Sequence, residues 1–460
     1  MGLTYQFVNF HKPLEISMDT QAKTNQFALL GQRRFAPFFW TQFSGAGNDN
    51  VFKFAFTVMV TYQLQVAWLP PALAGLVIGA LFILPYILFS ATSGQIADRW
   101  DKARLMRLVK NLEIAIMLLA AYGFVAQQAG VLLVCTFLMG CHSTLFGPAK
   151  FAYLPEVLQE RELVGGNGMV EMGTFVAILL GNMVGGLLVA IPDIGQSAAA
   201  AACLLFAVLG RVAAAFIPPT PARLQDQAMN WNPFTETAAN LRLAAADPVV
   251  FRSMLGISWM WFFGAVFLSQ FPSFAKTVLH GDEQVASLLL IVFSVGVGIG
   301  ALLCESLSRK GAGLGLGLVP LGAAGMSVFA VDLYFASRSL APSALMGVSA
   351  FVTQSAHWRV MVDLMLMSLF TGLFSVPMYA LIQQRSQVTH RARIIAANNI
   401  LNALFMVVSA VLAGALLGAG LTVPGVFLLT GLVNALFATY VCVKVPAYWQ
   451  DLRAMLGRAS

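Results

Sequence analysis

Long uninterrupted apolar segments dominate this sequence and leave few folds open to it. A hydrocarbon core about 30 Å thick is crossed by about 20 helical residues, and twelve segments of the 460-residue chain reach that length. Apolar residues make up 58% of the chain, charged residues only 10%, and the mean hydropathy is +0.77, whereas a soluble chain carries about 25% charged residues. The sequence therefore predicts an all-α integral membrane protein. It excludes a water-soluble enzyme, a disordered chain and a nucleic-acid-binding domain.

The predicted spans fall into two groups of six around the longest polar stretch, residues 218–248. The first group covers residues 35–62, 70–96, 105–127, 129–149, 168–191 and 197–217. The second covers residues 249–275, 284–307, 314–336, 358–384, 394–419 and 424–445. Prolines end the sixth span, and the rest of the polar stretch has the pattern of a short surface helix. We therefore predict, in chain order, an N-terminal segment (1–34), a six-helix bundle (35–217), a central loop (218–248), a second six-helix bundle (249–445) and a tail (446–460).

Most of the 27 Lys and Arg residues lie at the two termini, in the central loop and at the junctions on the same side of the membrane. Only Lys276, Arg338 and Arg359 lie at junctions on the opposite side. Loops rich in Lys and Arg stay in the cytoplasm, so we expect both termini and the central loop to be cytoplasmic. The first 34 residues are polar and mixed in charge, which is not the pattern of a cleavable signal peptide.

The two halves of the chain echo each other. Three matching pairs of segments occupy equivalent places in the hydropathy order: Gly94–Arg99 with Cys304–Arg309, Pro148 with Pro377, and Gly165–Asn167 with Ala396–Asn398. Such a parallel repeat predicts a substrate site near the membrane midplane, between two bundles that rock against each other. Three pairs of glycines four residues apart predict close helix contacts: Gly75 with Gly79, Gly181 with Gly185, and Gly296 with Gly300.

The first span carries a polar cluster made of Asn48, Asp49, Asn50 and Lys53. Asp49 follows Phe35 by about 21 Å of helical rise, which places it near the midplane. A charge there costs at least about 2.5–3.5 kcal/mol, so the cluster must face the bundle interior or a wet cavity. Asp49 and Lys53 are four residues apart and share a helix face. Two interpretations remain open: a structural ion pair, or a site for a zwitterion in which Asp49 faces an ammonium and Lys53 a phosphate.

Other intramembrane polar residues have competing interpretations. Glu171, one turn inside the fifth span, either lines the pathway or pairs with a cation such as Lys150. Glu113 lies at i+3 from Lys110 and is expected to be its structural partner. His142 is expected to be a hydrogen-bonded packing residue.

A doubly charged turn joins the second and third spans, and we interpret it as a conformational latch. Its residues are Gly94, Asp98, Arg99, Lys102 and Arg104. Asp98 can cap the end of a neighbouring helix while the basic residues hold the inner surface. No nucleotide-binding loop and no metal-ligand spacing occurs in the sequence. The five cysteines lie inside apolar runs, as small core residues do. We therefore expect no enzyme activity, no cofactor and no metal.

The two-bundle plan and the Asp98–Arg104 turn resemble the major facilitator superfamily. Four segments are more specific: Gln42–Asn50, Gly94–Asp98, Gly147–Phe151, and Asn167–Glu171 followed by Ile178–Gly181. Together they resemble the bacterial lysophospholipid transporter family, strongly over the first five spans and in outline over the last six.

The resemblance implies a facilitator in the bacterial inner membrane that moves lysophospholipid, chiefly lysophosphatidylethanolamine, to the cytoplasmic leaflet for reacylation. It implies Asp49 as the head-group residue, a functional link to an acyltransferase and acyl–acyl-carrier-protein synthetase, and no nucleic-acid partner. A lateral opening between helices would leave the acyl chain in lipid, with Phe52, Phe56, Trp259 and Trp261 as candidate wall residues. Two alternatives remain: a proton-coupled exporter of a small amphiphile or drug, and a membrane scaffold for a lipid-remodelling enzyme.

Overall fold

The computed structural model describes residues 25–64, 66–69, 71–221, 229–308, 313–338, 340 and 344–457, and every regular element among them is a helix. The predicted N-terminal segment is thus described only from Asn25 on. Residues 222–228 of the predicted central loop lie outside the described range, as does Arg309 of the predicted echo.

Six long helices form the first bundle. They are α1 (Ala36–Val58), α2 (Pro71–Arg99), α3 (Lys102–Val125), α4 (Ala129–Val157), α5 (Leu163–Val189) and α6 (Gly195–Ala215). Helix α1 packs against α5 and α6, α2 packs against α4, and α3 packs against α4 and α6. A π-helical turn (Met59–Gln63) extends α1, and short 3-10 helices η1 (Gln26–Gly31) and η3 (Glu160–Glu162) precede α1 and α5.

Six further long helices form the second bundle with the same packing order. They are α8 (Pro248–Thr277), α9 (Glu283–Ser308), α10 (Leu318–Arg338), α12 (Ser355–Arg385), α13 (Arg391–Gly418) and α14 (Val423–Lys444). Here α8 packs against α13 and α14, α9 against α12, and α10 against α12 and α14. Each contact has a counterpart in the first bundle, which is the arrangement that a parallel repeat produces.

Three shorter helices lie outside the two bundles. Helix α7 (Pro233–Ala245) is the surface helix expected in the central loop; Asn232 caps it and a proline opens it. Helices α11 (Val348–Thr353) and α15 (Pro446–Gly457) were not expected from the sequence. Tyr448 explains why the tail is helical, because its side chain is fully buried and its hydroxyl lies 2.6 Å from Ser253 Oγ of α8.

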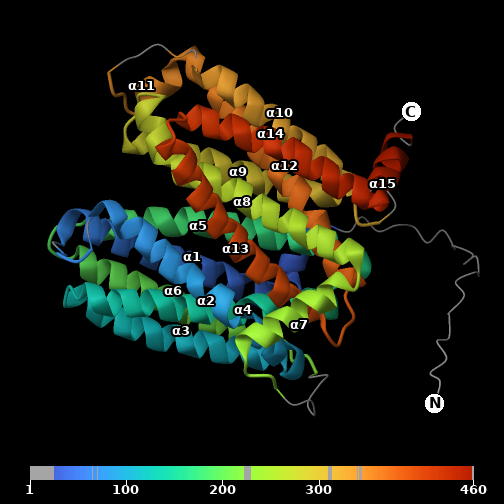
Figure 1. Ribbon diagram of the computed structural model, residues 1–460. Helices are drawn as coiled ribbons and strands as arrows, with labels where there is room; N and C mark the ends of the chain where they lie inside the picture. Colours follow the sequence, from blue (N-terminus) through green and yellow to red (C-terminus); the bar gives the residue numbers. More distant parts are fainter. Residues whose placement is uncertain are drawn as a thin grey trace, which may run out of the picture.

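The two bundles lie side by side and meet along two seams, α2 with α13 and α5 with α9 (Figure 1). Glycines allow both seams to close. A β-carbon on Gly94 would lie 2.7 Å from that of Ala396, and one on Gly168 would lie 2.4 Å from the carbonyl oxygen of Ala301. We call the end of the molecule that carries the α2–α3, α4–α5 and α12–α13 connections the basic-loop end.

The predicted glycine pairs contact neighbours in two of three cases. Gly181 and Gly185 approach the backbone of α1, and Gly296 and Gly300 approach that of α12. The remaining expectation was wrong for Gly79, where an added β-carbon would meet nothing within 4 Å.

Eleven described helices are long and apolar enough to cross a membrane. Helix α1 is not among them, because its polar residues lower its mean hydropathy, yet it lies in the bundle beside α5 and α6. The predicted spans match the helices to within a few residues, with one consequential exception. The fourth span was expected to end at residue 149, but α4 continues through Pro148 and Pro155 to Val157. Lys150 therefore lies within a membrane helix and not in a loop.

Candidate functional site

The four side chains of the α1 polar cluster contact different partners. Asp49 is half-buried, and its Oδ2 accepts a hydrogen bond from Ser143 Oγ of α4 (2.8 Å). Its Oδ1 is buried without a hydrogen-bond partner. Lys53 is also half-buried, and its Nζ lies 4.1 Å from the centre of the Phe82 ring of α2. Among the described side chains, Asp49 and Lys53 form no direct ion pair. Neither side chain is therefore occupied by the other.

The two asparagines of the cluster point elsewhere. Asn48 is fully buried, and its Nδ2 donates to Glu113 Oε1 of α3 (2.6 Å). Asn50 donates to the carbonyl of Ala46 one turn earlier (2.7 Å), and its β-carbon faces Gly181 of α5. In this conformation Asn48 and Asn50 hold helices together, so they lie apart from Asp49 and Lys53.

A buried ionic network lies behind the cluster. Lys110 Nζ donates to Glu113 Oε2 (2.5 Å), and His142 Nε2 lies 3.1 Å from the same oxygen. All three side chains are at most 3% exposed. The expected pairing of Lys110 with Glu113 therefore forms. A carboxylate with this many donors is satisfied at full burial, so the network is a structural core that fixes α1, α3 and α4.

Lys150 and Glu171 are two further ionisable side chains near this cluster, towards the basic-loop end. Lys150 Nζ donates to Thr174 Oγ1 of α5 (3.1 Å). Glu171 is 4% exposed, its Oε1 has no hydrogen-bond partner, and it interacts electrostatically with Lys150. Lys150 also lies within electrostatic range of Asp49. Lys150 thus sits in the field of two carboxylates, and the site as a whole contains two cations and two anions.

Aromatic side chains of the second bundle close the site on the basic-loop side. Tyr379 of α12 stacks on Phe151 of α4 with ring centroids 4.6 Å apart and an interplanar angle of 4°. Trp261 of α8 donates to the Tyr379 hydroxyl (3.3 Å) and stacks on Phe175 of α5. Trp261 therefore lies at the boundary of the two bundles, as a wall residue would.

The other candidate wall residues do not lie there. Phe52 and Phe56 are fully buried inside the first bundle, where Phe52 meets Phe124. Trp259 lies on the far side of α8, where its indole donates to Asn434 Oδ1 of α14 (2.8 Å). Their apolar character alone could not distinguish packing inside a bundle from the lining of a pathway.

The interpreted latch residues reach different partners. Asp98 is buried and accepts hydrogen bonds from the amides of Ala392 (2.9 Å) and Arg393 (3.1 Å), so it caps α13 across the seam. Gly94 permits this contact because it has no side chain to keep α2 away from the first turns of α13. Lys102 instead pairs with Glu156 of its own bundle (2.7 Å). Arg99 is half-buried and Arg104 is exposed.

Further contacts close the same end. Asn167 of α5 and Gln383 of α12 exchange two hydrogen bonds (2.6 and 3.0 Å), and Gln26 of η1 bonds to Glu305 and Leu302 of α9. Every hydrogen bond between the two bundles, within the part of the chain described, lies at the basic-loop end. The apolar packing agrees with this. The second bundle and the basic-loop half of the first bundle share one hydrophobic core. The other half of the first bundle forms a separate core. The structure is therefore closed at the basic-loop end.

The sequence named Lys150 as a possible partner of Glu171 but placed it in a loop, because the fourth span was expected to end at residue 149. A proline inside a membrane helix is tolerated when neighbouring groups satisfy the freed carbonyl, and α4 continues past Pro148. Tyr379 and the Asn167–Gln383 pair were not expected as parts of this arrangement. The pairing of Asn167 with Gln383 joins residues 216 positions apart, and nothing in a single sequence links them. Among the described residues, no group of three metal-ligating side chains could hold an ion.

Comparison with known proteins gives consistent matches. The sequence model described as Major Facilitator Superfamily matches residues 38–363. The chain is 28% identical over 352 residues to the lysophospholipid transporter LplT of Serratia proteamaculans, covering 75% of this chain and 79% of the relative. It is also 28% identical over 355 residues to LplT of Photorhabdus laumondii, covering 76% and 79%.

Solved structures share the fold at low sequence identity. A bacterial homologue of the iron transporter ferroportin in an outward-facing state has a TM-score of 0.63 and 16% identity, covering 90% of this chain and 99% of that one. The human organic anion transporter MFSD10 has a TM-score of 0.69 and 12% identity, covering 89% and 99%. The proton:xylose symporter XylE has a TM-score of 0.65 and 15% identity, covering 92% and 96%.

Proposed function

Because this chain belongs to the major facilitator superfamily, we propose that it is a transporter that moves lysophospholipid, lysophosphatidylethanolamine in particular, across the bacterial inner membrane by alternating access. The relatives named as lysophospholipid transporters support the substrate class. The excess of Lys and Arg at the basic-loop end supports a cytoplasmic location for that end and for both termini. Delivery to the cytoplasmic leaflet would supply an acyltransferase that restores the second chain.

One observation carries the proposal: two half-buried charges of opposite sign on α1 that do not pair with each other. A phosphoethanolamine head group carries one phosphate and one ammonium. Asp49, with its unpartnered Oδ1, would accept from the ammonium, and Lys53 with Lys150 would meet the phosphate. Glu171 would hold Lys150 in position. A polar site inside an apolar wall lowers the several-kcal/mol barrier that the membrane sets for a charged head group, and the acyl chain need not leave lipid.

Head-group selectivity tests the site more sharply than loss of transport. We expect Asp49→Asn to lower the rate of lysophosphatidylethanolamine uptake into spheroplasts by about tenfold or more, since a hydrogen bond to a charged group is worth about 1.5–3 kcal/mol. Uptake of lysophosphatidylglycerol, which lacks the ammonium, should change much less. Glu283→Gln removes an exposed carboxylate at the opposite end and serves as the matched control. Equal losses for both lipids would contradict the assignment of Asp49 to the ammonium.

A second candidate function, proton-coupled export of a small amphiphile, has one specific observation in its favour. Asp49 bonds to Ser143, whose Oγ lies 3.4 Å from His142 Nδ1, and His142 lies beside Glu113. This line of titratable groups could take up a proton. A protonophore should leave lysophospholipid uptake unchanged if the first proposal holds, and should abolish it if transport is proton-coupled.

A further inference from the structure

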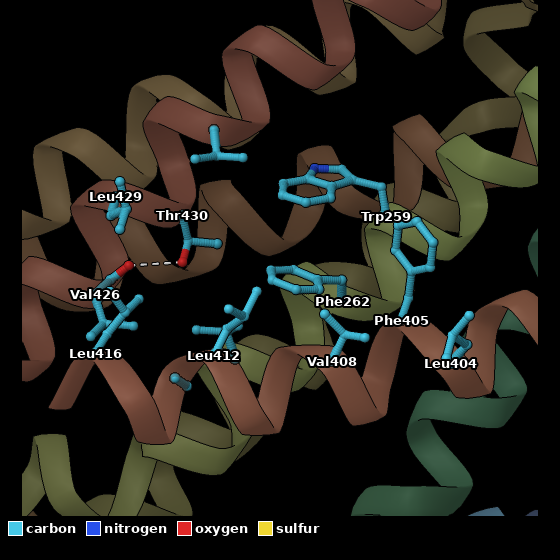
Figure 2. Close-up of a pocket in the computed structure, with 13 residues that line it drawn as sticks. Trp259, Phe262, Leu404, Phe405, Val408, Leu412, Leu416, Val426, Leu429 and Thr430 are labelled. Carbon is cyan, nitrogen blue, oxygen red and sulfur yellow. Dashed lines mark hydrogen bonds between the residues drawn. The ribbon is translucent and has the colours of Figure 1, made fainter. Parts of the chain in front are cut away.

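An apolar groove runs along the outside of the second bundle, between α13 and α14 with α8 as its floor (Figure 2). Its volume is about 420 Å³, within the range of about 300–1,000 Å³ that small-molecule sites occupy. Thirteen residues line it: Trp259, Phe262, Val266, Leu404, Phe405, Val408, Leu412, Ala413, Leu416, Val426, Leu429, Thr430 and Val433. None of them carries a charge.

The groove has a buried floor and an exposed rim. Val266 and Val426 are at most 2% exposed, whereas Leu404, Val408 and Leu412 on α13 are 41–47% exposed. These three rim residues recur every four positions, and Figure 2 shows them along one helix, pointing into the groove. In a membrane helix such an open apolar face is in contact with hydrocarbon.

The two polar side chains of the groove offer nothing to a polar ligand. Thr430 Oγ1 donates to the carbonyl of Val426 one turn earlier (2.7 Å), and the indole of Trp259 donates to Asn434, away from the groove. Because both donors are already satisfied, an occupant gains only from apolar contact, at about 0.8 kcal/mol per methylene.

The two helices that flank the groove pack less closely against each other than their counterparts in the first bundle do. There α1, α5 and α6 correspond to α8, α13 and α14. Gly181 and Gly185 bring α5 onto the backbone of α1, and Phe206 of α6 packs against Gly47. In the second bundle α13 and α14 make few direct contacts with each other.

The length and volume of the groove fit one acyl chain. From Leu404 to Leu416 the helical rise is about 18 Å, slightly more than half of the 30 Å hydrocarbon core. This part of α13 belongs to its half away from the basic-loop end. The groove therefore runs from near the midplane, at Trp259 and Phe405, to the outer surface, at Leu416.

We propose that this groove binds the acyl chain of a lysophospholipid in the outer leaflet and so forms a loading site on the transporter. The carbonyl end of the chain lies near Leu416 and Val426, and the methyl end lies near Trp259 and Phe405. This inference rests on the proposed function for the identity of the lipid. A single-chain lipid fits a groove that has room for one chain, and helix α13 connects the groove to the inter-bundle seam with α2.

Photolabelling of the purified full-length protein in proteoliposomes tests the proposal. The probe is lysophosphatidylethanolamine with a diazirine at the methyl end of its chain, and a second probe carries the diazirine near the carbonyl. We expect the first to label Trp259, Phe262 or Phe405 and the second to label Leu416 or Leu429. Excess unlabelled lysophosphatidylethanolamine should remove both signals.

A pair of variants on α13 provides the matched comparison. Val408→Trp fills the groove and should weaken labelling about tenfold, the cost of withdrawing about two methylenes from apolar contact. Val411→Trp places the same side chain on a 65% exposed position outside the groove and should leave labelling unchanged. Both positions are exposed enough to accept tryptophan in a folded protein.

Three outcomes would overturn the proposal: labelling at other helices, equal labelling by a diacyl phosphatidylethanolamine that carries the same diazirine, or cross-linked dimers joined through α13 and α14. Failure of the proposed function is a separate result. If the wild-type protein does not move lysophosphatidylethanolamine yet labelling follows the expected pattern, the transport proposal fails and the groove remains a lysophospholipid site.

Discussion

Removal of the Asp98 carboxylate should open the basic-loop end of the molecule. Asp98 accepts two amide hydrogen bonds from the first turn of α13, at Ala392 and Arg393, and is 4% exposed. Loss of a helix cap costs about 0.5–2 kcal/mol, and the favourable interaction of the carboxylate with the helix dipole is lost with it. A total of about 2 kcal/mol changes the ratio of closed to open molecules by about 30-fold.

Distances between spin labels measure this ratio. Glu160 and Gln387 are exposed positions in basic-loop connections of the first and second bundles, respectively. Cysteines are placed at both positions for spin labelling, and the five natural cysteines are replaced. Pulsed electron–electron double resonance should then show one short distance between the two labels in the parent protein. Asp98→Ala should add a longer distance.

Asp101→Ala is the matched control for this experiment. Asp101 lies in the same turn and caps α3, accepting from the amide of Arg104 (2.8 Å) and from that of Thr220 (3.2 Å). Those contacts do not cross to the second bundle, so this variant should keep the short distance. An unchanged distance distribution in Asp98→Ala, or an equal shift in both variants, would refute the role of Asp98 in closure.

Three further predictions concern stability, each measured by thermal unfolding in detergent. Glu113→Gln should destabilise the protein by about 3–5 kcal/mol, because it leaves the Lys110 ammonium buried and uncompensated. The double variant Lys110→Met/Glu113→Gln removes both charges and should lose less stability, so a larger loss in the double variant than in Glu113→Gln would contradict this. Gly300→Ala should cost about 1–3 kcal/mol, since its β-carbon would clash with the carbonyl oxygen of Leu369 in α12, and a neutral result would mean that the helices separate freely. Partial burial acts to raise the pKa of Asp247, but hydrogen bonds from Arg385 and from two amides of α8 outweigh it and lower the pKa below its usual range. The stabilisation relative to Asp247→Asn should therefore be present above about pH 4 and disappear as the pH falls further, and a difference that persists at pH 2 would argue against this pairing.

The fold follows from the sequence because membrane burial imposes a strong and simple pattern. Each span must satisfy its own backbone hydrogen bonds, so length and apolar content alone locate the helices. Hydropathy alone identifies eleven of the described helices, and α1 is recognised from the sequence although eight polar residues interrupt it. The tail helix α15 escaped notice because its burial depends on contacts with distant parts of the chain, such as Tyr448 with Ser253 and Asp451 with the amide of Gly317.

The candidate site follows from the sequence only in part. Asp49 and Lys53 attract attention because any intramembrane charge must have a reason. Their side-chain directions depend on partners from other helices, namely Ser143 and Phe82, which helical spacing does not identify. The i,i+4 rule places the two charges on one face, but it does not require that they bond. For Lys150 the error was local, since the fourth span was expected to end at residue 149 and α4 continues to Val157.

The capping role of Asp98 was the most specific expectation about the loops, and the structure shows the helix that it caps. The sequence contains the capping carboxylate and a small glycine beside it, but not the identity of the helix whose amides donate to that carboxylate, because α13 lies almost 300 residues away. Contacts between the two halves of a repeat protein are of this kind. They determine which end is open, and only the assembled structure reveals them.

Transport of lysophosphatidylethanolamine by the purified protein tests the central claim most directly. In proteoliposomes with a fluorescent lysophosphatidylethanolamine in the outer leaflet, extraction by albumin measures how much lipid has moved inward. We expect wild-type protein to protect the lipid from extraction over time, and Asp49→Asn to behave as protein-free vesicles do. Extraction that is equally complete with wild-type protein, with Asp49→Asn and with empty vesicles would contradict the account.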